Sequence, residues 1–80
     1  MDTRQMIALR LMQLCDQHNI SANYLATTAG IPRSTLKNIL YGRSRNPGIV
    51  TLKKLCDGLG ITLGEFFSTP EFDALEQEIQ

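Results

Sequence analysis

The stretch that decides the fold runs from Ile20 to Ile39 and reads ISANYLATTAGIPRSTLKNI. It holds two short helical patterns separated by Gly30. Ser21 is a suitable N-cap for the first helix, and Gly30 ends that helix because glycine adopts a positive φ without steric cost. Pro32 supplies the fixed φ that begins a second helix, predicted over 33–41. Two such helices cross at a steep angle through a glycine-containing turn.

The helix over 33–41 has two chemically different faces. Its inner face is apolar and consists of Leu36, Ile39 and Leu40; its outer face is polar and consists of Arg33, Ser34, Lys37 and Asn38, with Thr35 at the edge. Ala26 is small because this helix passes directly over it. A helix with such an outer face fits the ~12 Å wide major groove of DNA, where each base pair presents its own donor and acceptor pattern.

Helical patterns continue on both sides of this pair. Apolar residues recur at helical spacing over 3–18 and over 49–59, where Ile49, Leu52, Leu55, Cys56 and Leu59 are expected to be buried. A capping box at 62–65 opens one further turn. The whole predicts an all-α, compact five-helix bundle over 1–68 and a short acidic C-terminal helix over 69–80. In that last helix, Phe72, Leu75 and Ile79 fall at i, i+3 and i+7.

The charges are strongly segregated along the chain although the net charge is zero. Residues 17–56 contain six basic residues and no acid, namely Arg33, Lys37, Arg43, Arg45, Lys53 and Lys54. Residues 57–80 contain six acids and no base. A basic middle beside an acidic end is compatible with ordinary solvated faces, but it also attracts a polyanion to one surface only.

Composition excludes several other classes of protein. Eighty residues make one small domain, which is too small for a large enzyme with an enclosed active site. Cys15 and Cys56 are 41 positions apart and favour reduced, partly buried thiols, and with the lone His18 they are too few for a zinc site. We expect no metal, cofactor, small-molecule ligand or membrane span, and a cytoplasmic location.

The order of these motifs resembles a known family. Residues 20–39, the loop GRSRNP at 42–47 and the segment LCDGLGITLGEFF at 55–67 are similar to the Cro and phage-repressor-type (XRE) helix-turn-helix regulators, and the likeness covers about residues 5–67. The resemblance implies a fold of the lambda-repressor type and a bacterial or phage-encoded protein. The sequence departs from the family pattern at Ala22, where glutamine is frequent, and at Pro32, where serine or threonine often caps the helix.

The resemblance also assigns roles to individual residues. It implies that base edges are read by Arg33, Ser34, Thr35 and Asn38, and that DNA phosphates are bound by Ser21, Lys37, Arg43, Ser44 and Arg45. An arginine side chain can donate two hydrogen bonds to one guanine, and an asparagine side chain can form two hydrogen bonds with one adenine. Phosphate contacts fix the position of the protein on the duplex.

Regulators of this family usually bind inverted repeats as two-fold dimers, with recognition helices ~34 Å apart. We therefore expect a homodimer on double-stranded DNA, with dimer contacts from Phe72, Leu75 and Ile79. The leading hypothesis is a sequence-specific transcriptional regulator that represses by covering a promoter. The alternative is a protein-interaction module, antitoxin-like or an adaptor, that uses the acidic, partly apolar tail. An enzyme is disfavoured because no nucleophile and base are paired in the sequence.

Overall fold

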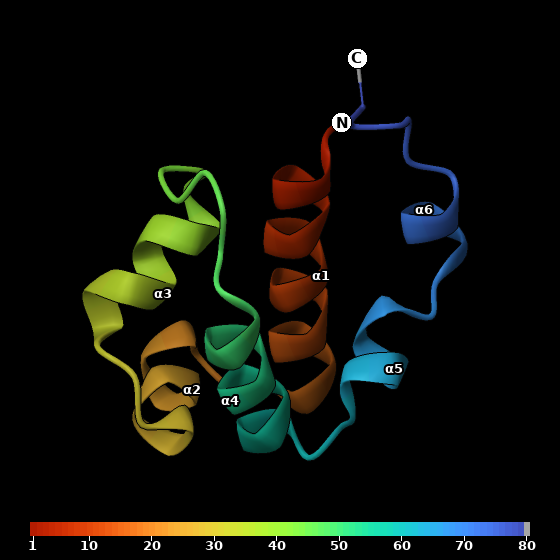
Figure 1. Cartoon of the computed structure of the whole chain (residues 1–80). Helices are drawn as coiled ribbons and strands as arrows, with labels where there is room; N and C mark the ends of the chain where they lie inside the picture. Colours follow the sequence, from red (N-terminus) through yellow and green to blue (C-terminus); the bar gives the residue numbers. More distant parts are fainter. Residues whose placement is uncertain (80) are drawn as a thin grey trace.

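The computed structural model describes residues 1–79, and within them the chain forms six helices and no strand (Figure 1). The helices are α1 (Thr3–His18), α2 (Ala22–Ala29), α3 (Arg33–Leu40), α4 (Ile49–Leu59), α5 (Leu63–Phe67) and α6 (Pro70–Asp73). The predicted all-α bundle is thus confirmed. In Figure 1, α1 stands between α3 on one side and α5 and α6 on the other, and α4 lies between α2 and the lower part of α1.

Local sequence signals set the helix starts. Asp2 caps α1, and its carboxylate accepts the Gln5 N–H at 2.9 Å while the Gln5 side chain accepts the Asp2 N–H at 2.8 Å. Thr62 and Glu65 form the same reciprocal pair at the start of α5, which confirms the predicted capping box. Such pairs satisfy amide groups that a helix start otherwise leaves without partners.

The core is apolar and draws on every helix except α6. Its fully buried members include Leu11 of α1, Leu25 of α2, Leu36 of α3, Leu55 of α4 and Phe66 of α5. Gly58 brings α4 close to α2, because a Cβ at this glycine would lie 3.2 Å from Leu25 Cδ1 and 3.3 Å from Ala29 Cβ. Because α3 packs against α1 and α2, the tight contact between α2 and α4 supports one of the two helices on which α3 rests.

The first turn of α4 departs from the prediction. Ile49 was expected to be buried but is 59% exposed, and its neighbour Val50 is 66% exposed. Ile49 does fall on the same helical stripe as Leu52. The stripe is buried only from Leu52 onward, so the first turn of α4 carries apolar side chains into solvent.

The C-terminal helix is much shorter than predicted. α6 ends at Asp73, so Phe72, Leu75 and Ile79 do not share one helical stripe, and Ile79 is 86% exposed. A helix is stabilised mainly by packing, and α6 buries no residue completely. The predicted helix reached residue 80, which lies outside the described residues.

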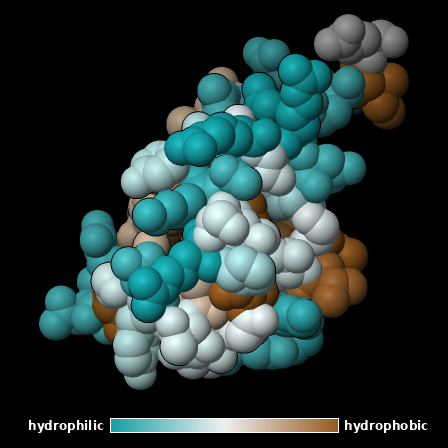
Figure 2. Space-filling view, turned by 90° about the vertical axis from the view of Figure 1, so that its left-hand side faces the viewer, coloured by the Kyte–Doolittle hydropathy of each residue, from teal (hydrophilic) through white to brown (hydrophobic). Residues whose placement is uncertain are grey.

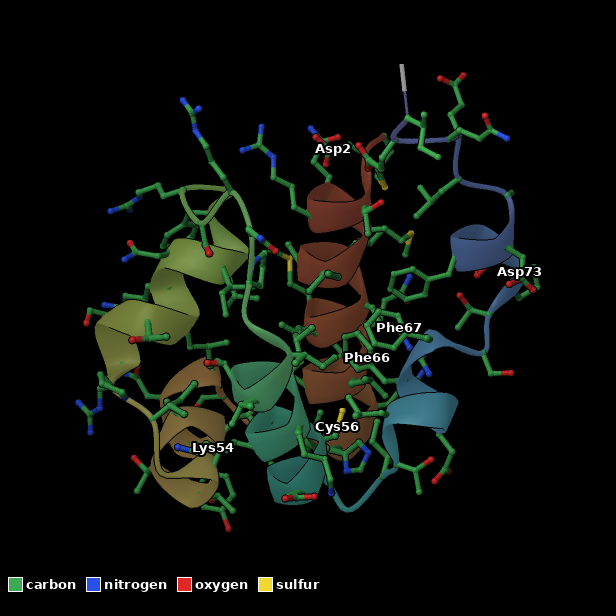
Figure 3. The ribbon with its side chains drawn as sticks, in the orientation of Figure 1. Asp2, Lys54, Cys56, Phe66, Phe67 and Asp73 are labelled. Atoms are coloured by element: carbon green, nitrogen blue, oxygen red, sulfur yellow. The ribbon has the colours of Figure 1, made fainter. Side chains whose placement is uncertain are left out.

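Aromatic packing holds this C-terminal segment to the bundle. The Phe72 ring lies 4.9 Å from the Phe67 ring and 5.9 Å from the Phe66 ring, measured between centroids. Figure 3 shows Phe66 and Phe67 between α1 and the C-terminal segment. Farther along, the Glu78 carboxylate accepts hydrogen bonds from Thr3 Oγ1 at 2.7 Å and from Thr3 N at 3.2 Å. The tail therefore closes back on the start of α1.

Candidate nucleic-acid interface

The turn between α2 and α3 has the predicted geometry. Gly30 has a φ of +72°, a value that residues with a Cβ rarely adopt. The Ile31 N–H donates to Ala26 O at 3.0 Å and the Gly30 N–H donates to Thr27 O at 3.2 Å, which closes the end of α2. The Ala26 side chain is completely buried, as predicted for a small residue beneath the next helix.

The predicted recognition helix, α3, presents its polar face to solvent. Leu36 and Ile39 are 1% and 3% exposed and attach α3 to the core. On the opposite side, Arg33, Ser34, Lys37 and Asn38 are exposed, and Thr35 is half-buried. Figure 2 views the molecule from the left-hand side of Figure 1, where α3 lies, and hydrophilic and neutral colours cover most of that face.

A hydrogen-bonded loop fixes the end of α3. Gly42 has a φ of +73°, and this turn directs two successive amides, those of Arg43 and Ser44, at Asn38 O at 2.8 and 3.0 Å. The Arg43 guanidinium lies over the Tyr41 ring, with its central carbon 5.4 Å from the ring centroid. The basic loop is therefore held against the helix that carries the predicted base-reading residues.

An open hollow joins the end of α3 to the start of α4. It has a volume of about 230 Å³ and is lined by Thr35, Asn38, Ile39, Arg43, Ser44, Pro47, Gly48 and Thr51. It brings together two residues predicted to read bases, Thr35 and Asn38, and two predicted to bind phosphate, Arg43 and Ser44. Thr51 was not predicted as a site residue, because a threonine in the first turn of a helix has no distinguishing sequence pattern.

The remaining predicted site residues lie outside the hollow. Arg33 and Ser34 occupy the first turn of α3, and Lys37 lies on its exposed side. Arg45 faces another hollow, which it lines with Arg4 and Glu78. Ser21 is the N-cap of α2, and its hydroxyl accepts the Tyr24 N–H at 3.1 Å.

Four basic residues of this side form no ion pair within residues 1–79. Two ion pairs occur within residues 1–79: Arg4 with Asp2 at 3.3 Å, and Lys53 with Asp57. In that part of the chain no carboxylate is paired with Arg33, Lys37, Arg43 or Arg45. Four unpaired cations on α3 and its following loop produce a positive surface suited to a polyanion.

Arg10 has a structural role that the sequence did not reveal. Its guanidinium donates to Phe66 O at 2.9 Å and to Glu65 O at 3.0 Å, so it satisfies carbonyl groups near the end of α5. An arginine in the middle of an amphipathic helix looks like any solvated charge in a sequence. Its partners lie more than 50 positions away and become visible only in the fold.

The titratable groups with shifted pKa values lie outside α3, and two of them, Asp2 and Glu78, line the same hollow as Arg45. Hydrogen bonds from the Thr3 hydroxyl and amide lower the pKa of Glu78, and the Gln5 amide lowers the pKa of Asp2. Burial raises the pKa of the Cys15 and Cys56 thiols, which favours the protonated form of both.

Residues 1–79 contain no group of three or more His, Cys, Asp or Glu side chains placed to hold a metal ion. None of the helices found in that range is long and apolar enough to cross a membrane.

A short helix anchored in the core, a turn at glycine and an exposed polar helix followed by a basic loop define a helix-turn-helix domain. Residues 10–71 match the family model of the Cro/C1-type HTH DNA-binding domain, and the chain belongs to this family. The structure is also similar to a solved structure described as the crystal structure of the prophage Lp1 protein 11. The two share 37% sequence identity and a TM-score of 0.82, over 94% of this chain and 100% of that chain. A search of curated proteins found no match.

Proposed function

We propose that this protein is a sequence-specific transcriptional regulator that inserts α3 into the major groove and represses by covering a promoter. The observation that carries the proposal is the outer face of α3. It is polar and exposed, it is attached to the core by Leu36 and Ile39, and it continues into a basic loop whose cations have no carboxylate partner within residues 1–79.

The chemistry of each side chain suggests its role on DNA. Arg33 donates two hydrogen bonds to a guanine, and Asn38 pairs with an adenine. Ser34 and Thr35 contact neighbouring base edges, Thr35 from the rim of the hollow. The phosphate contacts come from Lys37, Arg43, Ser44, Arg45 and Ser21. Because Arg43 and Ser44 are tied to Asn38 O, these phosphate contacts fix how deeply α3 enters the groove.

The proposal extends to a homodimer on an inverted-repeat operator in the cytoplasm of a bacterial host. Two copies bind two half-sites about one helical turn apart, ~34 Å. Leu75 is half-buried at the surface and is available for a dimer contact, as is Ile79. Phe72 also packs within its own chain, so truncating the tail would disturb the fold as well as a dimer.

Two alanine variants distinguish residues that recognise bases from residues that bind phosphates. Arg33→Ala is expected to cost ~1–3 kcal/mol of binding at a preferred site and to relax the preference at one base pair. Arg45→Ala is expected to weaken binding to all sequences similarly and to reduce its salt dependence, because one fewer counterion is released. Binding is measured by fluorescence anisotropy on preferred and scrambled duplexes at several salt concentrations.

Lys54→Ala is the matched control, since Lys54 is a basic residue on α4 outside the α3 face and its hollow. Equal losses from Arg33→Ala and Arg45→Ala on every duplex would contradict the assigned roles. Losses of the same size from Lys54→Ala would show that general charge, and not the α3 face, determines binding.

A further inference from the structure

Two shallow hollows flank Leu9 on the outer side of α1. The first, of about 310 Å³, is lined by Gln5, Ala8, Leu9, Met12, Leu40, Tyr41 and Gly42, from α1 and the end of α3. The second, of about 480 Å³, is lined by Met1, Met6, Leu9, Glu71, Ala74, Leu75 and Glu76, from α1 and the C-terminal segment. Since Leu9 lines both, the two hollows form one continuous surface, which we call the Leu9 surface.

This surface exposes large apolar side chains that the core does not use. Leu9 is 36% exposed, Met12 42% and Tyr41 64%. Single exposed apolar residues are common on proteins, but several gathered around two adjoining hollows are typical of an interaction site. Methionine is also well suited to such a site because its flexible side chain adapts to a partner.

The two ends of the Leu9 surface carry opposite charges. At one end, the Arg43 guanidinium lies over the Tyr41 ring. At the other end, Glu71 and Glu76 line the second hollow. A two-fold axis at right angles to the length of such a surface places each end against the opposite end of a second copy, and its centre against itself. Leu9 at the centre then meets apolar surface, and the acidic end meets the basic end.

We propose that the Leu9 surface binds a second copy of this chain in a two-fold dimer, with the Tyr41 and Arg43 end of one copy against the Glu71 and Glu76 end of the other. The proposal rests on the proposed function in that it supplies the dimer needed for an inverted repeat. It leaves Arg33, Ser34 and Lys37 uncovered, because none of them lines either hollow. Arg43 also lines neither hollow and lies at their rim, over Tyr41, where its five N–H donors are enough for a partner carboxylate and a DNA phosphate together. The proposal also gives the acidic tail a role in dimerisation, whereas DNA binding by the α3 face gives the tail no role.

The test compares two exposed apolar positions. Met12→Glu places a charge at the Leu9 surface, and Val50→Glu places the same charge on α4, at a residue that is 66% exposed and lines neither hollow. Sedimentation equilibrium of the full chain measures the dimer dissociation constant. The wild type and Val50→Glu are expected to reach twice the 8.9 kDa chain mass, while Met12→Glu weakens the dimer at least about tenfold.

A second variant tests the charges and avoids the apolar centre. Glu71→Lys combined with Glu76→Lys changes two exposed side chains, leaves the core intact and is expected to weaken the dimer several-fold, with the loss largest at low salt. Circular dichroism confirms that each variant is folded. A wild type that stays monomeric, a dimer unaffected by Met12→Glu and by the charge reversal, or equal weakening by Val50→Glu would each overturn the proposal.

DNA binding is measured separately on a duplex with one half-site. If Met12→Glu still binds this duplex like the wild type but no longer dimerises, both proposals stand. If dimerisation depends on Met12 but neither the wild type nor any variant binds a duplex, the dimer surface stands and the proposed function fails. If DNA is bound but the mass does not respond to Met12→Glu, only the dimer surface fails.

Discussion

Helix α3 and the C-terminal segment both have a proline at the start of their helix, but they end differently. α3 follows Pro32, and α6 starts with Pro70 at its first position. Two side chains of α3, Leu36 and Ile39, are less than 5% exposed. The helix ends at a glycine turn, where the backbone amides of Arg43 and Ser44 donate to Asn38 O. α6 buries no residue completely, lasts four residues and continues as an irregular tail held by Phe72 and Glu78.

The difference shows what a helix of this size requires. A start signal alone does not propagate a helix, because nucleation is costly and most helical stability comes from packing. α3 has apolar anchors on successive turns and a stop signal, so its limits are fixed. The tail has one anchor in its first turn and then acidic residues, so its chain is free to place Glu78 at Thr3.

The largest expected effect compares one leucine from each region. Leu36→Ala removes a side chain that is 1% exposed beneath α3 and is expected to lower the free energy of unfolding by ~2–5 kcal/mol. Leu75→Ala removes a half-buried side chain in the tail and is expected to cost about 1 kcal/mol or less. Urea denaturation measures both. Equal losses would show that the tail is as much a part of the core as α3.

The second prediction compares how two glycine-to-alanine substitutions change the stability of the fold. Gly42→Ala forces a positive φ on a residue with a Cβ, and since no atom crowds that Cβ, the expected cost of ~1–2 kcal/mol is backbone strain alone. Gly64→Ala lies within α5, where the new Cβ meets Thr62 Oγ1 at an ordinary 3.7 Å, and is expected to stabilise by up to ~1 kcal/mol. Thermal denaturation measures both signs, and the same sign for both would contradict the conformational explanation.

The smallest effect concerns the contact that closes the tail. The lowered pKa of Glu78 means that its contribution to stability is present above the unfolded-state pKa and is lost as the pH falls through the folded-state pKa, below its ordinary 4.5. Thr3→Val removes the hydroxyl donor and is expected to raise the Glu78 pKa toward 4.5. NMR titration of the carboxyl carbon measures it. An unchanged pKa in Thr3→Val would show that this hydrogen bond does not hold the tail.

The sequence predicted the helix-turn-helix region well because several signals agree there. Ser21, Gly30 and Pro32 mark the limits of α2 and α3, and the apolar stripe identifies which side of α3 faces the core. Where only one signal was present, prediction failed. Ile49 fits the stripe of α4 but lies beyond the packed part of it, and helical spacing in the tail had no packing to support it.

Parts of the candidate site were beyond sequence reasoning for a different reason. The two amides on Asn38 O, the hollow that includes Thr51 and the Arg10 contacts with α5 all depend on how separate segments meet. Residue type and spacing describe one segment at a time. They indicate which side chains are exposed. They do not indicate which residues from distant parts of the chain lie beside those side chains on the folded surface.

The most direct test of the central claim is selection of bound duplexes from a random pool, carried out with the wild type and with Asn38→Ala. We expect the wild type to enrich an inverted repeat and Asn38→Ala to lose preference at one adenine in each half-site, because its side chain lies on the exposed face of α3. No enrichment by the wild type at low ionic strength, or an identical motif from the variant, would contradict the claim that this face reads DNA.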